Sequence, residues 1–165
     1  MGFMDILERY AGQAAGAAPP DTHADFSTVA SQAPPDALGS GIADALRGGQ
    51  AGSFASAIEQ LFANSDRQQR TGLLAQLVQA AGPALLSSFA GGALSHLAQP
   101  GVPVQPADTD ALTPAQAGEL ASAAHANDPG IVDRVGAFYS QHPTVVKALG
   151  AAALAFAMNR MARRA

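Results

Sequence analysis

The segment His142–Arg164, HPTVVKALGAAALAFAMNRMARR, is the longest apolar stretch of the chain. Pro143 suits the first turn of a helix, because its missing N–H would have no partner there in any case. The arginines at the far end suit the negative pole of the helix dipole. These features predict one helix of about 20 residues, roughly 30 Å long. Such a helix must bury its apolar surface in a protein core, in a partner or in a membrane.

The composition of the 165-residue chain predicts an all-α fold. Alanine is abundant, aromatic residues make up only 5%, and tryptophan is absent. Alanine is the strongest helix former, whereas β-branched and aromatic residues favour strands. We therefore expect a multi-helix orthogonal bundle whose helices pack closely through small residues. The chain has no cysteine, which excludes disulfides, thiolate zinc sites and cysteine nucleophiles.

Proline- and glycine-rich stretches divide the chain into four expected parts. Residues 1–20 should contain a short amphipathic helix and a flexible linker that ends in two prolines. Residues 21–98 carry a series of helical apolar stripes and should form the helical core domain. A proline-rich linker at 99–112 then leads to a C-terminal three-helix segment at 113–165.

Two tetrapeptides have the pattern of a capping box, in which a side chain at each end bonds the backbone N–H at the other. They are SDRQ at 65–68 and TPAQ at 113–116, the second with proline at the first helical position. Both predict the start of a helix.

The N-terminal helix has its large apolar side chains on one face, with Asp5, Glu8 and Arg9 on the other. A helix of about ten residues is marginal in water by itself, so this one must dock on something. Two arrangements stay open at this point. The helix packs on its own domain, or the linker lets it reach a neighbouring chain or an interface.

The charge of the chain is unevenly distributed. The net charge is −4, yet the region from Lys147 onward holds four basic residues and no acidic one. This basic end suits the helix dipole and the acidic body of the chain, and the alternative is attraction to an anionic lipid surface. Nucleic acid is not expected as a partner, because the rest of the surface is acidic and no aromatic or glycine-rich module accompanies the arginines.

The sequence contains no recognisable catalytic or ligand-binding motif. The histidines form no HExxH pattern, the Gly39–Asp44 stretch lacks the third glycine of a dinucleotide loop, and no phosphate-binding loop is present. We therefore predict a protein that is not an enzyme and has no catalytic residue, metal or cofactor. The N-terminus lacks the basic and apolar regions of a signal peptide, which predicts a cytoplasmic protein.

Two non-enzymatic functions fit these features. The first is a helical interaction or self-assembly protein, which binds itself or another protein through the C-terminal apolar helix and the N-terminal amphipathic helix. The alternative is a peripheral protein of a membrane or granule surface that uses the basic C-terminal helix. An enzyme with an unrecognised site is the third hypothesis. The predicted interaction residues are Phe3, Ile6, Leu7, Tyr10, Val145, Leu149, Ala153, Phe156, Arg160, Arg163 and Arg164.

Three stretches carry a resemblance to a known family: MGFMDIL at 1–7, RQQRTGLLAQL at 67–77 and LTPAQA at 112–117. They resemble the YidB-like family of small bacterial proteins, mainly over residues 1–117. The resemblance implies a soluble all-helical fold and a bacterial origin. It carries no activity and no catalytic residues over to this chain.

Overall fold

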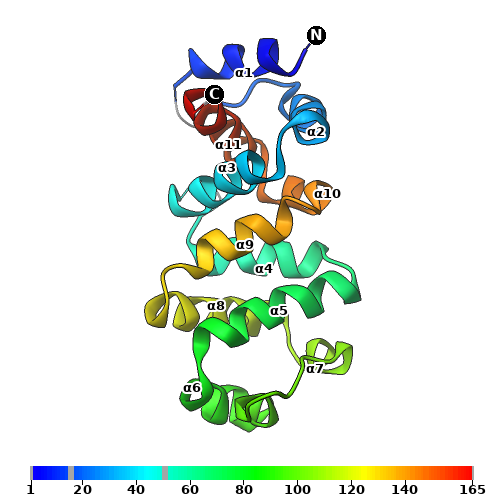
Figure 1. Ribbon diagram of the computed structural model, residues 1–165, viewed down its shortest axis with the longest axis vertical. Coiled ribbons are helices and arrows are strands. Elements are labelled where there is room, and N and C mark those ends of the chain that lie inside the picture. Colours follow the sequence, from blue (N-terminus) through cyan, green and yellow to red (C-terminus); the bar gives the residue numbers. More distant parts are fainter. Residues whose placement is uncertain (1, 15–16, 50–51, 165) are drawn as a thin grey trace. The chain divides into compact units, whose positions relative to one another are not determined.

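The computed structural model describes residues 2–14, 17–49 and 52–164, and these residues form an all-α helical bundle (Figure 1). Together they make eleven α-helices and three short 3₁₀ helices, with no strand. The prediction of an all-α fold is therefore confirmed. The chain divides into two compact units: unit 1 is Met1–Ser53 with Val135–Ala165, and unit 2 is Phe54–Arg134.

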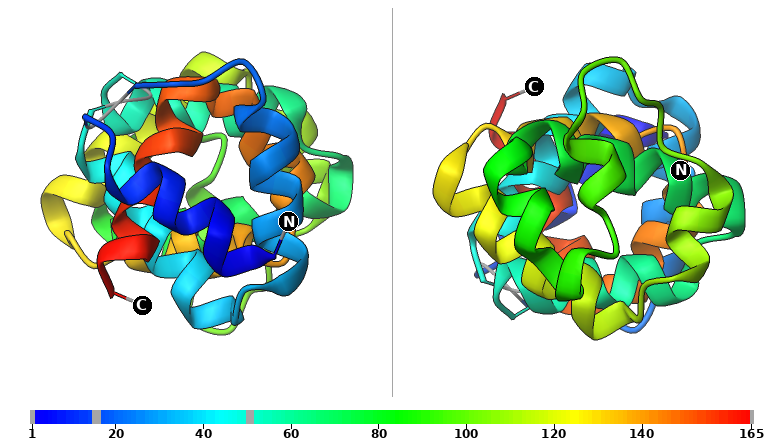
Figure 2. Two further views of the ribbon diagram at one scale, coloured as in Figure 1. Left: turned by 90° about the horizontal axis from the view of Figure 1, so that it is seen from above. Right: turned by 90° about the horizontal axis from the view of Figure 1, so that it is seen from below.

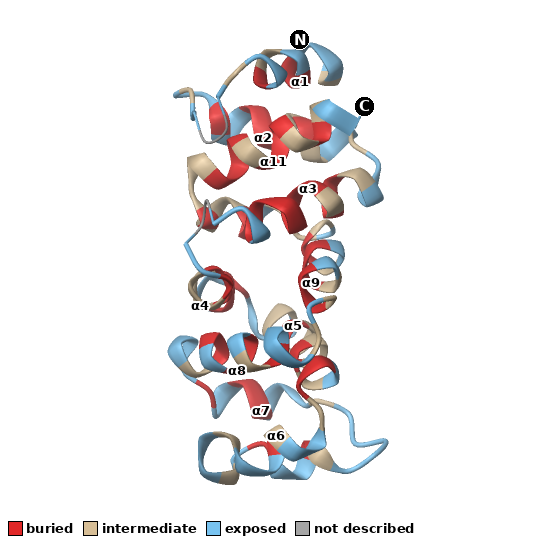
Figure 3. Ribbon diagram, turned by 90° about the vertical axis from the view of Figure 1, so that its left-hand side faces the viewer, coloured by how far each residue is buried: buried red, intermediate tan, exposed pale blue. Residues whose placement is uncertain are grey.

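Unit 1 brings the two ends of the chain together around the C-terminal helix α11, which packs against α1, α2 and α3. Figure 2 shows α1 in dark blue beside the red end of the chain, and Figure 3 shows α3 buried over most of its length. Its elements are α1 (Phe3–Ala11), α2 (Thr22–Gln32), α3 (Pro35–Arg47), α10 (Pro143–Val146), η3 (Lys147–Leu149), α11 (Ala151–Arg164) and the second part of α9 (Ile131–Tyr139).

The core of unit 1 combines large apolar side chains, such as Phe26 and Ile42, with the small residues that the composition predicts. Helix α11 buries Ala153, Leu154, Ala155, Ala157, Met158, Asn159 and Met161. Helices α3 and α9 approach backbone to backbone at Gly39 and Gly136, where neither residue has a side chain to hold the helices apart. Close approach of this kind lets a chain with few large side chains reach the packing density of a protein interior.

The C-terminal apolar segment is not the single helix that the sequence predicts. A helix does begin at Pro143, but η3 ends at Leu149 and α11 starts after a bend of 118°. Gly150 lies at this bend with φ 93° and ψ 162°, a conformation that glycine adopts and other residues avoid. The segment therefore buries its apolar residues in two parts: α10 and η3 bury Val145, Val146 and Leu149, and α11 packs against α1, α2 and α3.

Unit 2 is organised around α8, which packs against α4 and α5. Helix α7 packs against α5, and α6 packs against η2. Its elements are α4 (Phe54–Asn64), α5 (Arg67–Ala81), α6 (Pro83–Ser88), η1 (Phe89–Gly92), η2 (Ser95–Ala98), α7 (Pro106–Asp110), α8 (Pro114–Asn127) and the first part of α9.

The two units differ from the predicted division of the chain. Residues 99–112, predicted as an extended linker, contain α7, whose buried Asp108 accepts the Gln105 N–H at 2.8 Å. Two of the predicted parts, 21–98 and 113–165, are each divided between the units. In the second of them, α8 packs within unit 2 and α11 packs within unit 1. The predicted flexible linker before residue 21 includes residues 15–16, which lie outside the described part of the chain.

One of the two predicted capping boxes is confirmed. Thr113 Oγ1 accepts the Gln116 N–H at 3.1 Å, and Gln116 Oε1 accepts the Thr113 N–H at 3.0 Å. The other box lies one residue later than predicted, between Asp66 and Gln69. Ser65 instead donates its hydroxyl to a carbonyl at the end of α4 at 2.6 Å. Serine and aspartate are both good N-caps, so the sequence pattern did not separate the two registers.

Candidate functional site: the docking of α1 on α11

Helix α1 lies on α11 and α2 with its apolar face turned inward. Ile6, Leu7 and Tyr10 are at most 2% exposed, whereas Met4 is 49% exposed. The amphipathic pattern thus predicted the docking face, and among the described residues that face is covered by the same chain. Because a nine-residue helix is marginal alone, these contacts are what keep α1 folded.

Asn159 of α11 binds the C-terminal end of α1. Its Nδ2 donates to the Tyr10 carbonyl at 2.6 Å and lies 3.4 Å from the Gln13 carbonyl. Carbonyls at a helix end have no partner within the helix, so a side chain from a neighbouring helix can bond them. Asn159 is only 4% exposed. The sequence presents Asn159 merely as a polar interruption of an apolar stretch, and its partner lies 149 residues away.

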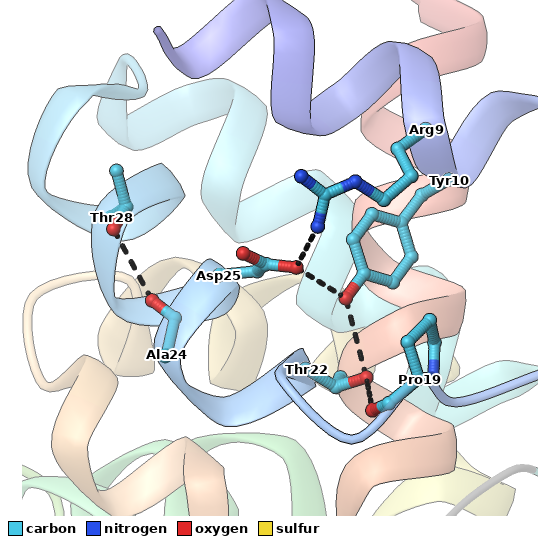
Figure 4. A network of polar contacts seen from close by, with 7 residues as sticks. All are labelled: Arg9, Tyr10, Pro19, Thr22, Ala24, Asp25 and Thr28. Carbon is cyan, nitrogen blue, oxygen red and sulfur yellow. Dashed lines mark hydrogen bonds and ion pairs between the residues drawn. The ribbon is translucent and has the colours of Figure 1, made fainter. Parts of the chain in front are cut away.

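A buried polar network joins α1 to α2 (Figure 4). The Tyr10 hydroxyl donates to Asp25 Oδ2 at 2.9 Å, and Arg9 Nη1 bonds the same oxygen at 3.0 Å. The Tyr10 oxygen also lies 3.2 Å from Thr22 Oγ1, which donates its own proton to the Pro19 carbonyl at 2.6 Å. The network fixes α1 at the point where the linker turns into α2.

Replacing Tyr10 with phenylalanine should lower the free energy of unfolding by about 1 kcal/mol at neutral pH, because one buried hydrogen bond is lost. The same change should reduce the loss of stability in alkali. Burial, with a smaller contribution from the Asp25 carboxylate, raises the pKa of Tyr10 above its ordinary value of 10.0. The unfolded chain therefore releases this proton first, and wild-type stability is complete below about pH 10 and falls as the pH rises further.

Urea unfolding of both proteins at about pH 8 and about pH 11 measures this difference. The stability gap between wild type and Tyr10→Phe should narrow at the higher pH. An equal gap at both pH values would show that Tyr10 does not contribute to the alkaline loss.

Three arginines surround one largely buried carboxylate on the other side of α11. Arg164 lies 2.8 Å and Arg160 lies 3.3 Å from Asp44 Oδ2, and Arg47 lies 3.8 Å from Oδ1. The Asp44 side chain is 10% exposed, whereas the arginine side chains are 43–50% exposed. We call these four residues the Asp44 cluster. Because three positive charges face one negative charge, the cluster is a positively charged patch at the end of α11.

A small apolar pocket adjoins this cluster. Its volume is about 190 Å³, and most of its lining is apolar. The lining residues come from α1, from α3 and the residue before it, and from α11: Phe3, Leu7, Pro34, Ala37, Met161 and Arg164. Arg164 therefore belongs both to the pocket and to the Asp44 cluster.

The structure separates the predicted interaction residues by their exposure. Phe3, Phe156 and Arg160 are half-buried, and Arg163 and Arg164 are exposed. The others are buried in unit 1: Ile6, Leu7, Tyr10, Val145, Leu149 and Ala153. These apolar side chains already have intramolecular neighbours, so a partner reaches them only if a covering helix moves away.

One polar contact lies within unit 2. His96 Nε2 lies 2.7 Å from Asp108 Oδ1 and ties η2 to α7. Within the described ranges, no group of three or more acidic or histidine side chains is arranged to hold a metal ion.

The helices of the described ranges also differ in apolar length. No single helix there is long and apolar enough to cross a membrane, and only two strongly bent helix pairs have the required length and composition when taken together.

Comparison of the chain with protein-family models, with curated proteins and with solved structures gives no match. The resemblance to the YidB-like family therefore stays a prediction.

Proposed function

We propose that this protein is a non-enzymatic interaction protein that associates with copies of itself by exchanging α1. The supporting observation is that α1 docks on α11 and α2 at the far end of a short connecting segment. In the exchanged form, α1 of one copy would occupy the same place on α11 of a second copy. Such domain swapping needs no new interface, because the contacts of the closed form are made again between copies.

The connecting segment sets the balance between the closed and the exchanged form. It runs from Gly12 to Asp21 and spans at most about 35 Å when extended. A connection of this length keeps α1 at a high effective concentration near its own α11, which favours the closed form. Pro19 and Pro20 stiffen the part next to α2 and so restrict the return of α1. We therefore expect exchange to depend on protein concentration.

The first test is light-scattering mass after size exclusion over a wide range of protein concentrations. The mass should rise with concentration from the 16.6 kDa of one chain toward twice that value. A mass that stays at one chain up to millimolar concentration would contradict self-association through α1.

A crosslinking experiment identifies the exchanged element. The chain has no cysteine, so single cysteines can be introduced without interference. Phe3 of α1 and Ala37 of α3 line the same pocket, so these positions come close only where α1 is docked. Mixed Phe3→Cys and Ala37→Cys proteins, treated with a short thiol crosslinker, should form a covalent pair of the two different chains.

The matched control uses Met4→Cys in place of Phe3→Cys. Met4 is the next residue of α1, but it is exposed and does not line the pocket. Its yield of mixed pairs should be several-fold lower. Equal yields from the two positions would mean that the chains collide at random, and the exchange of α1 would then be wrong.

A further inference from the structure

The pocket between α1, α3 and α11 has the features of a small ligand site. It is concave, its walls are mainly apolar, and one charged side chain stands at its edge, which is the usual composition of such sites. Phe3, Leu7 and Met161 supply large apolar side chains from two helices that are distant in sequence. Its volume of about 190 Å³ is slightly larger than the roughly 150 Å³ of an apolar cavity that admits benzene.

Arg164 gives this pocket a charged end. Arg164 is one of the lining residues, and its guanidinium group lies 2.8 Å from Asp44 Oδ2. A guanidinium group has five N–H donors, and the two oxygens of Asp44 are also approached by Arg160 and Arg47. The arginines of the Asp44 cluster therefore have more donors than one carboxylate can accept. The Arg164 side chain is half-exposed, so an anion that enters the pocket from solvent can reach it.

We propose that the pocket binds a free, medium-chain fatty carboxylate, with the hydrocarbon tail between α1 and α11 and the carboxylate on Arg164. The apolar walls fit the tail, and the excess positive charge of the Asp44 cluster fits the head. Arginine bonds carboxylates with two parallel N–H donors, which adds geometric specificity to the charge attraction. The small volume favours a medium-length free chain over a membrane lipid, whose chains are much longer than the pocket.

The proposal does not rest on self-association. An exchanged α1 would rebuild the same pocket with Phe3 and Leu7 from the second copy. Binding is therefore measured at a concentration where light scattering gives the mass of a single chain. If octanoate does not bind, the proposed exchange of α1 still stands. If α1 is not exchanged, the proposed ligand site still stands.

The binding experiment compares three probes by titration calorimetry and by shifts of backbone amide NMR signals. Octanoate has both tail and head, octanol has the tail without the charge, and acetate has the charge without the tail. Octanoate should bind about tenfold more tightly than octanol, and acetate should not bind measurably. The shifted signals should cluster at residues 3–7, 34–37 and 161–164. Equal affinity for octanoate and octanol would overturn the role of Arg164.

Two neighbouring arginines supply a matched pair of variants. Arg164 lines the pocket and bonds Asp44, whereas the exposed Arg163 does not line it. Arg164→Gln should reduce octanoate affinity about tenfold and leave octanol affinity unchanged. Arg163→Gln should change neither. If both variants lost octanoate affinity to a similar degree, general attraction by the basic chain end would explain the binding. That result would overturn the proposal.

A third variant tests the place of the tail. Ala37→Leu adds side-chain volume at the pocket wall and should abolish binding of both octanoate and octanol while the thermal unfolding curve stays cooperative.

Vesicles of anionic phospholipid provide the remaining comparison. Vesicle binding that is weakened equally by Arg163→Gln and Arg164→Gln, without any octanoate binding, would replace this proposal by attachment to an anionic membrane surface.

Discussion

Replacing Gly136 with alanine should lower the free energy of unfolding by about 1–3 kcal/mol, as overpacking of a tight core typically does. In most helix interiors the same change is stabilising by about 1 kcal/mol, because alanine is the better helix former. The sign reverses here because a Cβ at Gly136 would lie 2.5 Å from the Gly39 carbonyl oxygen and 3.0 Å from the Ala43 nitrogen. Both atoms belong to the backbone of α3, so neither can rotate away as a side chain would.

Equilibrium urea unfolding measures this effect, and Gly12→Ala supplies the control. Gly12 has φ −83°, a value that alanine adopts, and a Cβ there would meet nothing within 4 Å. The control should therefore be neutral or slightly stabilising. If Gly136→Ala proved as stable as wild type, the backbone contact between α3 and α9 would not exist as described.

The fold class could be predicted from the sequence because it follows from local preferences repeated along the whole chain. Helix propensity, apolar periodicity and proline at first turns all point to helices. The box at Thr113 and Gln116 could be placed correctly because Pro114 fixes the register of the helix start. The break at Gly150 could not be predicted, because the apolar pattern continues on both sides of it and a single glycine inside a helix costs only about 1 kcal/mol.

The candidate site could be predicted only in part, because local spacing shows the face of a helix but not its tertiary partners. The apolar face of α1 is visible in the spacing of Ile6, Leu7 and Tyr10, and its burial follows from that spacing. The polar groups that fix α1 are not visible, because Asp25 and Asn159 find their partners through the tertiary fold. A pattern within one helix identifies the face that must be covered but not the residues that cover it.

Replacing Asn159 with leucine should destabilise the docked form of α1 by about 2 kcal/mol. The variant loses the bonds to the Tyr10 and Gln13 carbonyls. The Tyr10 carbonyl keeps a bond from the Gln13 N–H at 3.2 Å, so the main cost is the loss of a buried donor between two helices. Limited proteolysis in the segment before Pro20 should become about tenfold faster or more, because cleavage follows the population of the open form. Asn64→Leu is the control, since Asn64 is exposed and bonds only its own helix at Gln60.

The same variant distinguishes exchange of α1 from other routes to a dimer. In an exchanged dimer, Asn159 of each copy would bond the α1 carbonyls of the other copy, so closed and exchanged forms contain the same bonds per chain. Asn159→Leu therefore weakens both forms equally and should leave the monomer–dimer equilibrium unchanged. The rate of subunit exchange between labelled copies should nevertheless rise about tenfold, because every exchange passes through an undocked α1. A shifted equilibrium with an unchanged exchange rate would place the interface away from α1.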